Sequence, residues 1–128
     1  MPSRRFASLL ILGSLGMSPA SAADMTLEFS WRGVEACRGG GVSPALQVKN
    51  APRGTRTFFF TLERILGRET RELGGSSVPF RADGQIPPGS VYTNAPCEPA
   101  DYRWTVKALD ATGRTIATAS KAEFFAGR

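Results

Sequence analysis

The stretch "RTFFFTLE", from Arg56 to Glu63, decides the fold class of this 128-residue chain. Three consecutive phenylalanines stand between two threonines, and aromatic and β-branched residues are the types that are enriched in β-strands. A short apolar run of this kind is typical of a strand in the interior of a sheet. The sequence therefore predicts a central β-strand here.

Further strand signals lie on both sides of this run. Apolar and polar residues alternate in "MTLEFSW" (25–31) and "YRWTVKALD" (102–110), which predicts strands with one buried face. "ALQVKN" (45–50) is a shorter candidate, and "DATG" (110–113) predicts a hairpin turn into a last strand over 114–125. With little helix expected outside the leader, the fold class is mainly β: a small antiparallel β-sandwich.

The N-terminus has the features of an export signal. Arg4 and Arg5 precede the apolar run "FASLLILGSLGM", and the small residues of "SPASAAD" then suit cleavage before Asp24, or one residue earlier. The alternative, an uncleaved anchor, is disfavoured because the apolar run is short for a membrane span. We therefore expect a signal peptide over 1–23, one domain over 24–128 without a stable membrane span, and a periplasmic or secreted protein.

Charge and cysteine content limit the possible partners. The chain carries 16 Lys and Arg against 11 Asp and Glu, and loss of Arg4 and Arg5 would leave 14 against 11, or +3. The sequence shows no basic stripe with interleaved aromatics, so no nucleic-acid partner is expected. Cys37 and Cys97 form an even pair, which in an exported chain predicts a disulfide. A redox or metal pair is the alternative, but there is no C-x-x-C spacing.

The chain contains no histidine, the commonest general base and metal ligand. Catalytic Ser-His-Asp and Cys-His arrangements are therefore excluded, and no phosphate-loop glycine pattern is present. We expect a non-enzymatic protein without a metal or another cofactor.

The charged stretch "LERILGRETRELGGSS", from Leu62 to Ser77, follows the central strand directly. We interpret Arg64 to Glu72 as a solvated loop in which opposite charges partly pair, for example Arg68 with Glu72.

Several short motifs in order resemble the phosphatidylethanolamine-binding protein (PEBP) or Raf-kinase-inhibitor-like family, in its bacterial YbhB/YbcL-like branch. The motifs are Cys37 followed by "SPAL" (43–46), "APRGT" (51–55), Tyr92 with "APCEP" (95–99), and "YRW" (102–104) before "ALD" (108–110). They cover most of the chain after the leader. The resemblance implies a PEBP-like β-sandwich in which Cys37 and Cys97 tie two loops together.

The family's ligand site is an anion pocket suited to a phosphate or phospholipid headgroup. The resemblance places Arg64 where that pocket has an aspartate, Leu73 where it has a histidine, and Tyr102 where it has a second histidine. Arg103 and Pro96 match supporting residues of the pocket.

Two interpretations of this pocket follow. Either it has decayed, or Arg64, Arg68 and Arg103 converge on a remodelled anion site with Tyr102 and Pro96, since guanidinium groups bind phosphate and carboxylate through paired hydrogen bonds. The chain is thus expected to be a binding module for an anionic small ligand or phospholipid headgroup. A structural or protein-interaction protein with no small-molecule site is the alternative.

Overall fold

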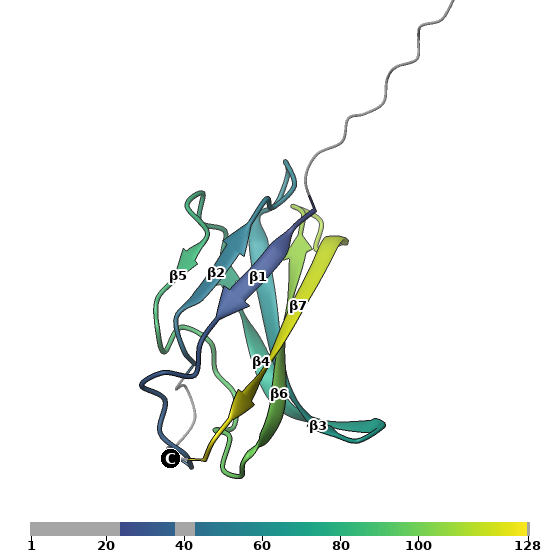
Figure 1. Cartoon of the computed structure of the whole chain (residues 1–128). Coiled ribbons are helices and arrows are strands. Elements are labelled where there is room, and N and C mark those ends of the chain that lie inside the picture. The colour runs from purple at the N-terminus through teal and green to yellow at the C-terminus, as the bar shows by residue number, and fades with distance from the viewer. Residues whose placement is uncertain (1–23, 38–42, 128) are drawn as a thin grey trace, which may run out of the picture.

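The computed structural model describes residues 24–37 and 43–127, which form seven strands in two antiparallel sheets (Figure 1). One sheet has the order β1-β2-β5 and the other β4-β3-β6-β7. The strands are β1 (Thr26–Phe29), β2 (Leu46–Lys49), β3 (Thr57–Leu66), β4 (Glu69–Pro79), β5 (Gln85–Ile86), β6 (Ala100–Leu109) and β7 (Thr115–Phe125). No helix occurs among the described residues, and the mainly-β prediction is confirmed.

The phenylalanine run Phe58–Phe60 belongs to the first half of β3, which lies inside the larger sheet. It pairs with β4 on one side and with β6 on the other, from Thr57 opposite Leu109 to Arg64 opposite Tyr102. Phe58, Phe60 and Leu62 point into the core because successive side chains of a strand alternate between its two faces. The predicted central position of this strand is confirmed.

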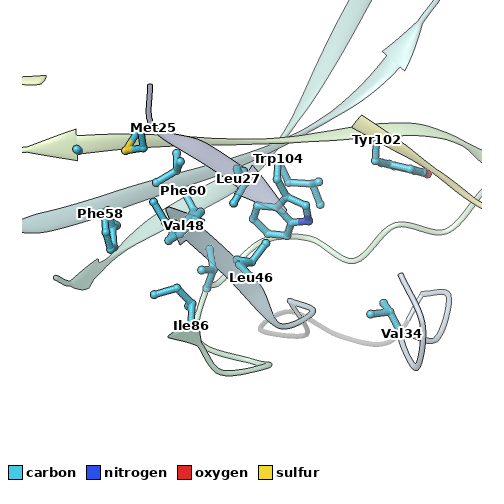
Figure 2. Close-up of a cluster of buried hydrophobic side chains, with 14 of the residues drawn as sticks. Met25, Leu27, Val34, Leu46, Val48, Phe58, Phe60, Ile86, Tyr102 and Trp104 are labelled. Atoms are coloured by element: carbon cyan, nitrogen blue, oxygen red, sulfur yellow. The ribbon is translucent and has the colours of Figure 1, made fainter. Parts of the chain in front are cut away.

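The core fills the space between the two sheets (Figure 2). The smaller sheet contributes Leu27, Leu46, Val48 and Ile86, and β6 contributes Tyr102, Trp104, Val106 and Ala108. The predicted alternation of 102–110 is confirmed, since all four of these β6 residues are buried. Trp104 is fully buried, and its indole N–H has no hydrogen-bond acceptor among the described residues.

The charged stretch is not a loop, and this prediction was wrong. Leu62 to Leu66 completes β3, Gly67 and Arg68 form the turn, and Glu69 to Ser77 belongs to β4. Figure 1 shows the tip of this hairpin projecting beyond the rest of the sandwich. Gly67 has a φ of +64°, a conformation that glycine adopts without steric cost. No ion pair between Arg68 and Glu72 forms in this hairpin.

Two other predictions concern the ends and cross-links of the domain. Cys37 and Cys97 form the predicted disulfide, with their Cα atoms 4.5 Å apart. The predicted signal peptide over 1–23 lies outside the described residues. Within the described part of the chain, no helix is long and apolar enough to cross a membrane.

Candidate functional site: an arginine-lined cavity

A small cavity of about 190 Å³ lies where the β3–β4 hairpin meets the segment that precedes β6. Arg64 comes from β3, Arg71 and Leu73 come from β4, and Tyr102 comes from β6. The remaining wall is the segment Ala95–Glu98, which includes Pro96 and Cys97.

Strand register explains why these side chains meet. Arg64 lies directly opposite Arg71 on β4 and directly opposite Tyr102 on β6. Side chains of directly opposite residues lie on the same face of a sheet. Since Tyr102 is buried on the core face, Arg64 and Arg71 also lie on the side of the sheet that faces the core.

Arg64 has one ion-pair partner and one unsatisfied donor. Its Nη1 lies 2.6 Å from Oε1 of Glu98, while its Nε is buried and makes no hydrogen bond. The Arg64 side chain is 24% exposed and the Glu98 side chain is 65% exposed, so the ion pair lies at the mouth of the cavity. One donor of the guanidinium is therefore buried without an acceptor among the described residues.

The wall opposite Arg64 is held in place by three contacts. The Tyr102 hydroxyl donates a 2.8 Å hydrogen bond to the backbone carbonyl of Glu98. The Cys37 N–H donates to the Pro96 carbonyl at 2.9 Å, and the disulfide joins the same two segments. Because the wall is anchored on both sides of Cys97, the cavity is largely pre-formed.

The cavity carries a surplus positive charge. Arg71 is exposed and makes no ion pair with any residue that the structure describes. Glu98 is the one carboxylate that lines the cavity, and it already pairs with Arg64. Two guanidinium groups thus face one carboxylate, an arrangement suited to an added anion.

Arg103 does not reach this cavity. It lies between the buried residues Tyr102 and Trp104, so alternation directs its side chain to the opposite face of the sheet. There its Nε and Nη2 bind Oε1 of Glu63 at 2.9 and 2.7 Å. The predicted convergence of Arg64 and Arg103 on one anion site is therefore wrong.

Arg68 also lies away from the cavity, in the turn at the tip of the hairpin. Of the five residues predicted as a ligand site, the structure brings together Arg64, Tyr102 and Pro96.

Arg71 lines the cavity but is not among the predicted site residues. It faces Arg64 because the hairpin turns at Gly67 and Arg68, and the only sequence signal for that turn is the glycine between two charged segments. Leu73 lines the cavity as well, at the position where the family resemblance places a histidine. It is the extra residue of the irregularity in the β3–β4 pairing, since Leu62 pairs with Gly74 and Glu63 with Glu72.

Comparison with known proteins supports the fold. No family model matches the sequence, and no curated protein matches it. A crystal structure from Chlamydia trachomatis, described as that of a homolog of phosphatidylethanolamine-binding protein, matches with a TM-score of 0.58 and 16% identity. The match covers 80% of this chain and 97% of that chain. This chain therefore has a PEBP-like fold.

Proposed function

We propose that the protein is an exported, non-enzymatic binding module that holds a single anionic group, phosphate or carboxylate, between Arg64 and Arg71. The volume of about 190 Å³ suits one such group and is well below the roughly 300–1,000 Å³ of pockets that enclose a drug-sized ligand. A larger ligand, such as a phospholipid, would place only its phosphate in this cavity.

The observation that carries the proposal is the direct opposition of Arg64 and Arg71 across β3 and β4. Like charges that face each other across a strand pair destabilise the sheet. An anion between the two guanidinium groups would convert this repulsion into two sets of charge-assisted hydrogen bonds. Among the described residues, the Nε of Arg64 is buried without an acceptor and only Nη1 meets Glu98, so the charge of this guanidinium is only partly compensated.

The fold and the sequence support the same assignment. The structural neighbour is described as a PEBP homolog. Arg64, Tyr102 and Pro96, which the sequence resemblance assigns to that family's pocket, all line this cavity. Export is supported by the apolar leader in the sequence and by the disulfide Cys37–Cys97, a cross-link that persists in oxidising compartments.

Calorimetric titration of the chain that begins at Asp24, with inorganic phosphate and with acetate at low ionic strength, tests the proposal. Arg71→Gln should weaken binding by about tenfold or more, because a charge-assisted hydrogen bond contributes about 1.5–3 kcal/mol. Arg68→Gln removes the same charge from the hairpin tip, outside the cavity, and should leave the affinity nearly unchanged.

Absence of phosphate and acetate binding by the unaltered chain would overturn the proposal. It would favour the alternative, a structural or protein-interaction protein with no small-molecule site. In that case the ion pair between Glu98 and Arg64 would have a structural role alone. Turnover in a hydrolase substrate screen, abolished by a single carboxylate substitution, would overturn the non-enzymatic assignment.

A further inference from the structure

A second charged region lies at the end of the sandwich remote from the arginine-lined cavity. Three turns meet there: 50–56 after β2, 81–84 before β5, and 110–114 between β6 and β7. Backbone hydrogen bonds join their flanks, from Val48 N–H to the Gly84 carbonyl and from Arg56 N–H to the Leu109 carbonyl. In Figure 1 this is the upper end, where β1 begins.

The charges of the domain are distributed unevenly. The upper end holds five cations and three carboxylates among its turns and strand ends: Lys49, Arg53, Arg56, Arg81 and Arg114 against Asp24, Asp83 and Asp110. The other described residues comprise seven Lys and Arg and eight Asp and Glu. The excess positive charge of the described domain is therefore confined to this end, which we call the basic end.

Two of the carboxylates at the basic end are already engaged. Asp83 lies 3.5 Å from Arg81, and a hydrogen bond from the Gln85 backbone holds the pKa of its carboxyl below the usual value. Asp110 lies 3.8 Å from Arg114, and hydrogen bonds from Thr112, then from the Arg114 backbone, lower the pKa of that carboxyl too.

Three cations of the basic end have no such partner. Lys49, Arg53 and Arg56 are exposed and make no ion pair with any residue in the described ranges. Their charge faces solvent uncompensated, so this end attracts anionic partners at low ionic strength.

Apolar side chains accompany these cations. Phe80, just after β4, is 39% exposed, and Ile116, near the start of β7, is 37% exposed. Phe80 follows one outer strand of the larger sheet, β4, and Ile116 lies on the other outer strand, β7, so they flank the cationic turns. Peripheral membrane binding usually combines cations, which attract anionic headgroups, with neighbouring apolar side chains, which enter the membrane interface. A soluble anionic polymer would engage the cations but gain little from exposed Phe80 and Ile116.

We propose that the basic end is a docking surface for an anionic lipid bilayer. Docked this way, the domain directs the β3–β4 hairpin and the arginine-lined cavity away from the membrane, because they lie at the opposite ends of β3 and β6. The surface is independent of the cavity, and either one could exist without the other.

Co-sedimentation of the chain from Asp24 with vesicles of phosphatidylcholine, with and without phosphatidylglycerol, tests this proposal. All seven strands and the whole described core lie within this chain, and circular dichroism would verify that each variant folds. Arg53→Gln with Arg56→Gln should lower the vesicle partition coefficient about 25-fold at low salt, because each cation near an anionic surface contributes roughly a fivefold factor. Arg32→Gln with Arg68→Gln removes two exposed charges elsewhere and serves as the matched control.

We expect vesicle binding that requires phosphatidylglycerol and weakens with salt. Binding should fall for the double variant at Arg53 and Arg56 and persist for the control double variant. Phe80→Ser should weaken it further. Equal losses for the two double variants would overturn the proposal in favour of net charge alone. Loss with Arg71→Gln but not with Arg53→Gln and Arg56→Gln would instead place a headgroup in the cavity. Binding to dextran sulfate without binding to vesicles would identify a polymer partner and also overturn it.

Discussion

The carboxylate of Glu98 pairs with the Arg64 guanidinium at the place where a bound anion would lie. Removal of this carboxylate should therefore strengthen anion binding. The Glu98 carboxylate is 2.6 Å from Nη1 of Arg64, and its backbone is fixed by the hydrogen bond from Tyr102. The side chain can leave while the backbone stays in place, because it is 65% exposed. An incoming phosphate must therefore displace this carboxylate or share the guanidinium with it.

The expected magnitude follows from the exposure of the ion pair. A pair with one largely exposed partner is screened by solvent and contributes about 0.2–1 kcal/mol. If ligand binding breaks this pair, Glu98→Gln should raise the affinity for phosphate about twofold to fivefold. The same substitution should lower the free energy of unfolding by about 0.2–1 kcal/mol. The reason is that Arg64 and Arg71 then repel each other without a compensating carboxylate.

Calorimetric titration with inorganic phosphate, together with thermal unfolding of the same samples, measures both effects. Glu72→Gln is the matched control, because Glu72 lies opposite Glu63 in the register and does not line the cavity. The gain in affinity should shrink at high salt, where the Debye length falls to about 3 Å.

An unchanged or lower phosphate affinity in Glu98→Gln would show that Glu98 does not compete with the anion, and an equal gain in Glu72→Gln would contradict a specific role of Glu98. Failure of both the unaltered chain and Glu98→Gln to bind would refute the proposed function itself.

Three further expectations concern stability. Gly75→Ala should destabilise the fold by about 3 kcal/mol, because the added Cβ would come 2.1 Å from the Phe60 carbonyl oxygen in the neighbouring strand. Gly113→Ala has open space around it but a φ of +86°, so it should lower the free energy of unfolding by only about 1 kcal/mol. Equal shifts of the melting temperature in the two variants would contradict this ranking. Replacing Cys37 and Cys97 together by alanine should lower the free energy of unfolding by about 4 kcal/mol in denaturant titration, since the disulfide closes a 60-residue separation. The pKa of Asp110 is lowered in the fold, so its stabilisation is present above the unfolded value of 3.8 and is lost as pH falls through the folded pKa. Asp110→Asn should therefore flatten the acid limb of the stability profile, and an unchanged limb would argue against this role.

The strands that border the core could be predicted because burial imposes a readable period. Alternation over 102–110 requires Tyr102, Trp104, Val106 and Ala108 to share one face, and the structure buries all four. The run of phenylalanines after Arg56 likewise predicted the strand that lies inside the larger sheet.

The hairpin over the charged stretch could not be predicted in this way. Its tip projects past the smaller sheet, so Arg68 to Glu72 are all exposed and carry no apolar period. Charged residues at such a tip are compatible with a loop and with a strand, because their side chains are surrounded by solvent in both structures. Only Gly67 marks the turn, and its significance depends on the strands that flank it.

Residue types and their spacing predicted the mainly-β fold and the pairing of the two cysteines, and the lack of histidine excluded histidine chemistry. The family resemblance singled out three residues that line the cavity, Arg64, Tyr102 and Pro96. The tertiary structure alone decided which arginines meet. A shift of one residue in strand register moves a side chain to the other face of a sheet. Register placed Arg71 beside Arg64 and sent Arg103 to Glu63 on the opposite face. Alternation along β6 already directs Arg103 away from the face of Tyr102 and Trp104. Which side chain each arginine meets depends on how β3 pairs with β4 and β6, and residue types along one strand do not specify that pairing.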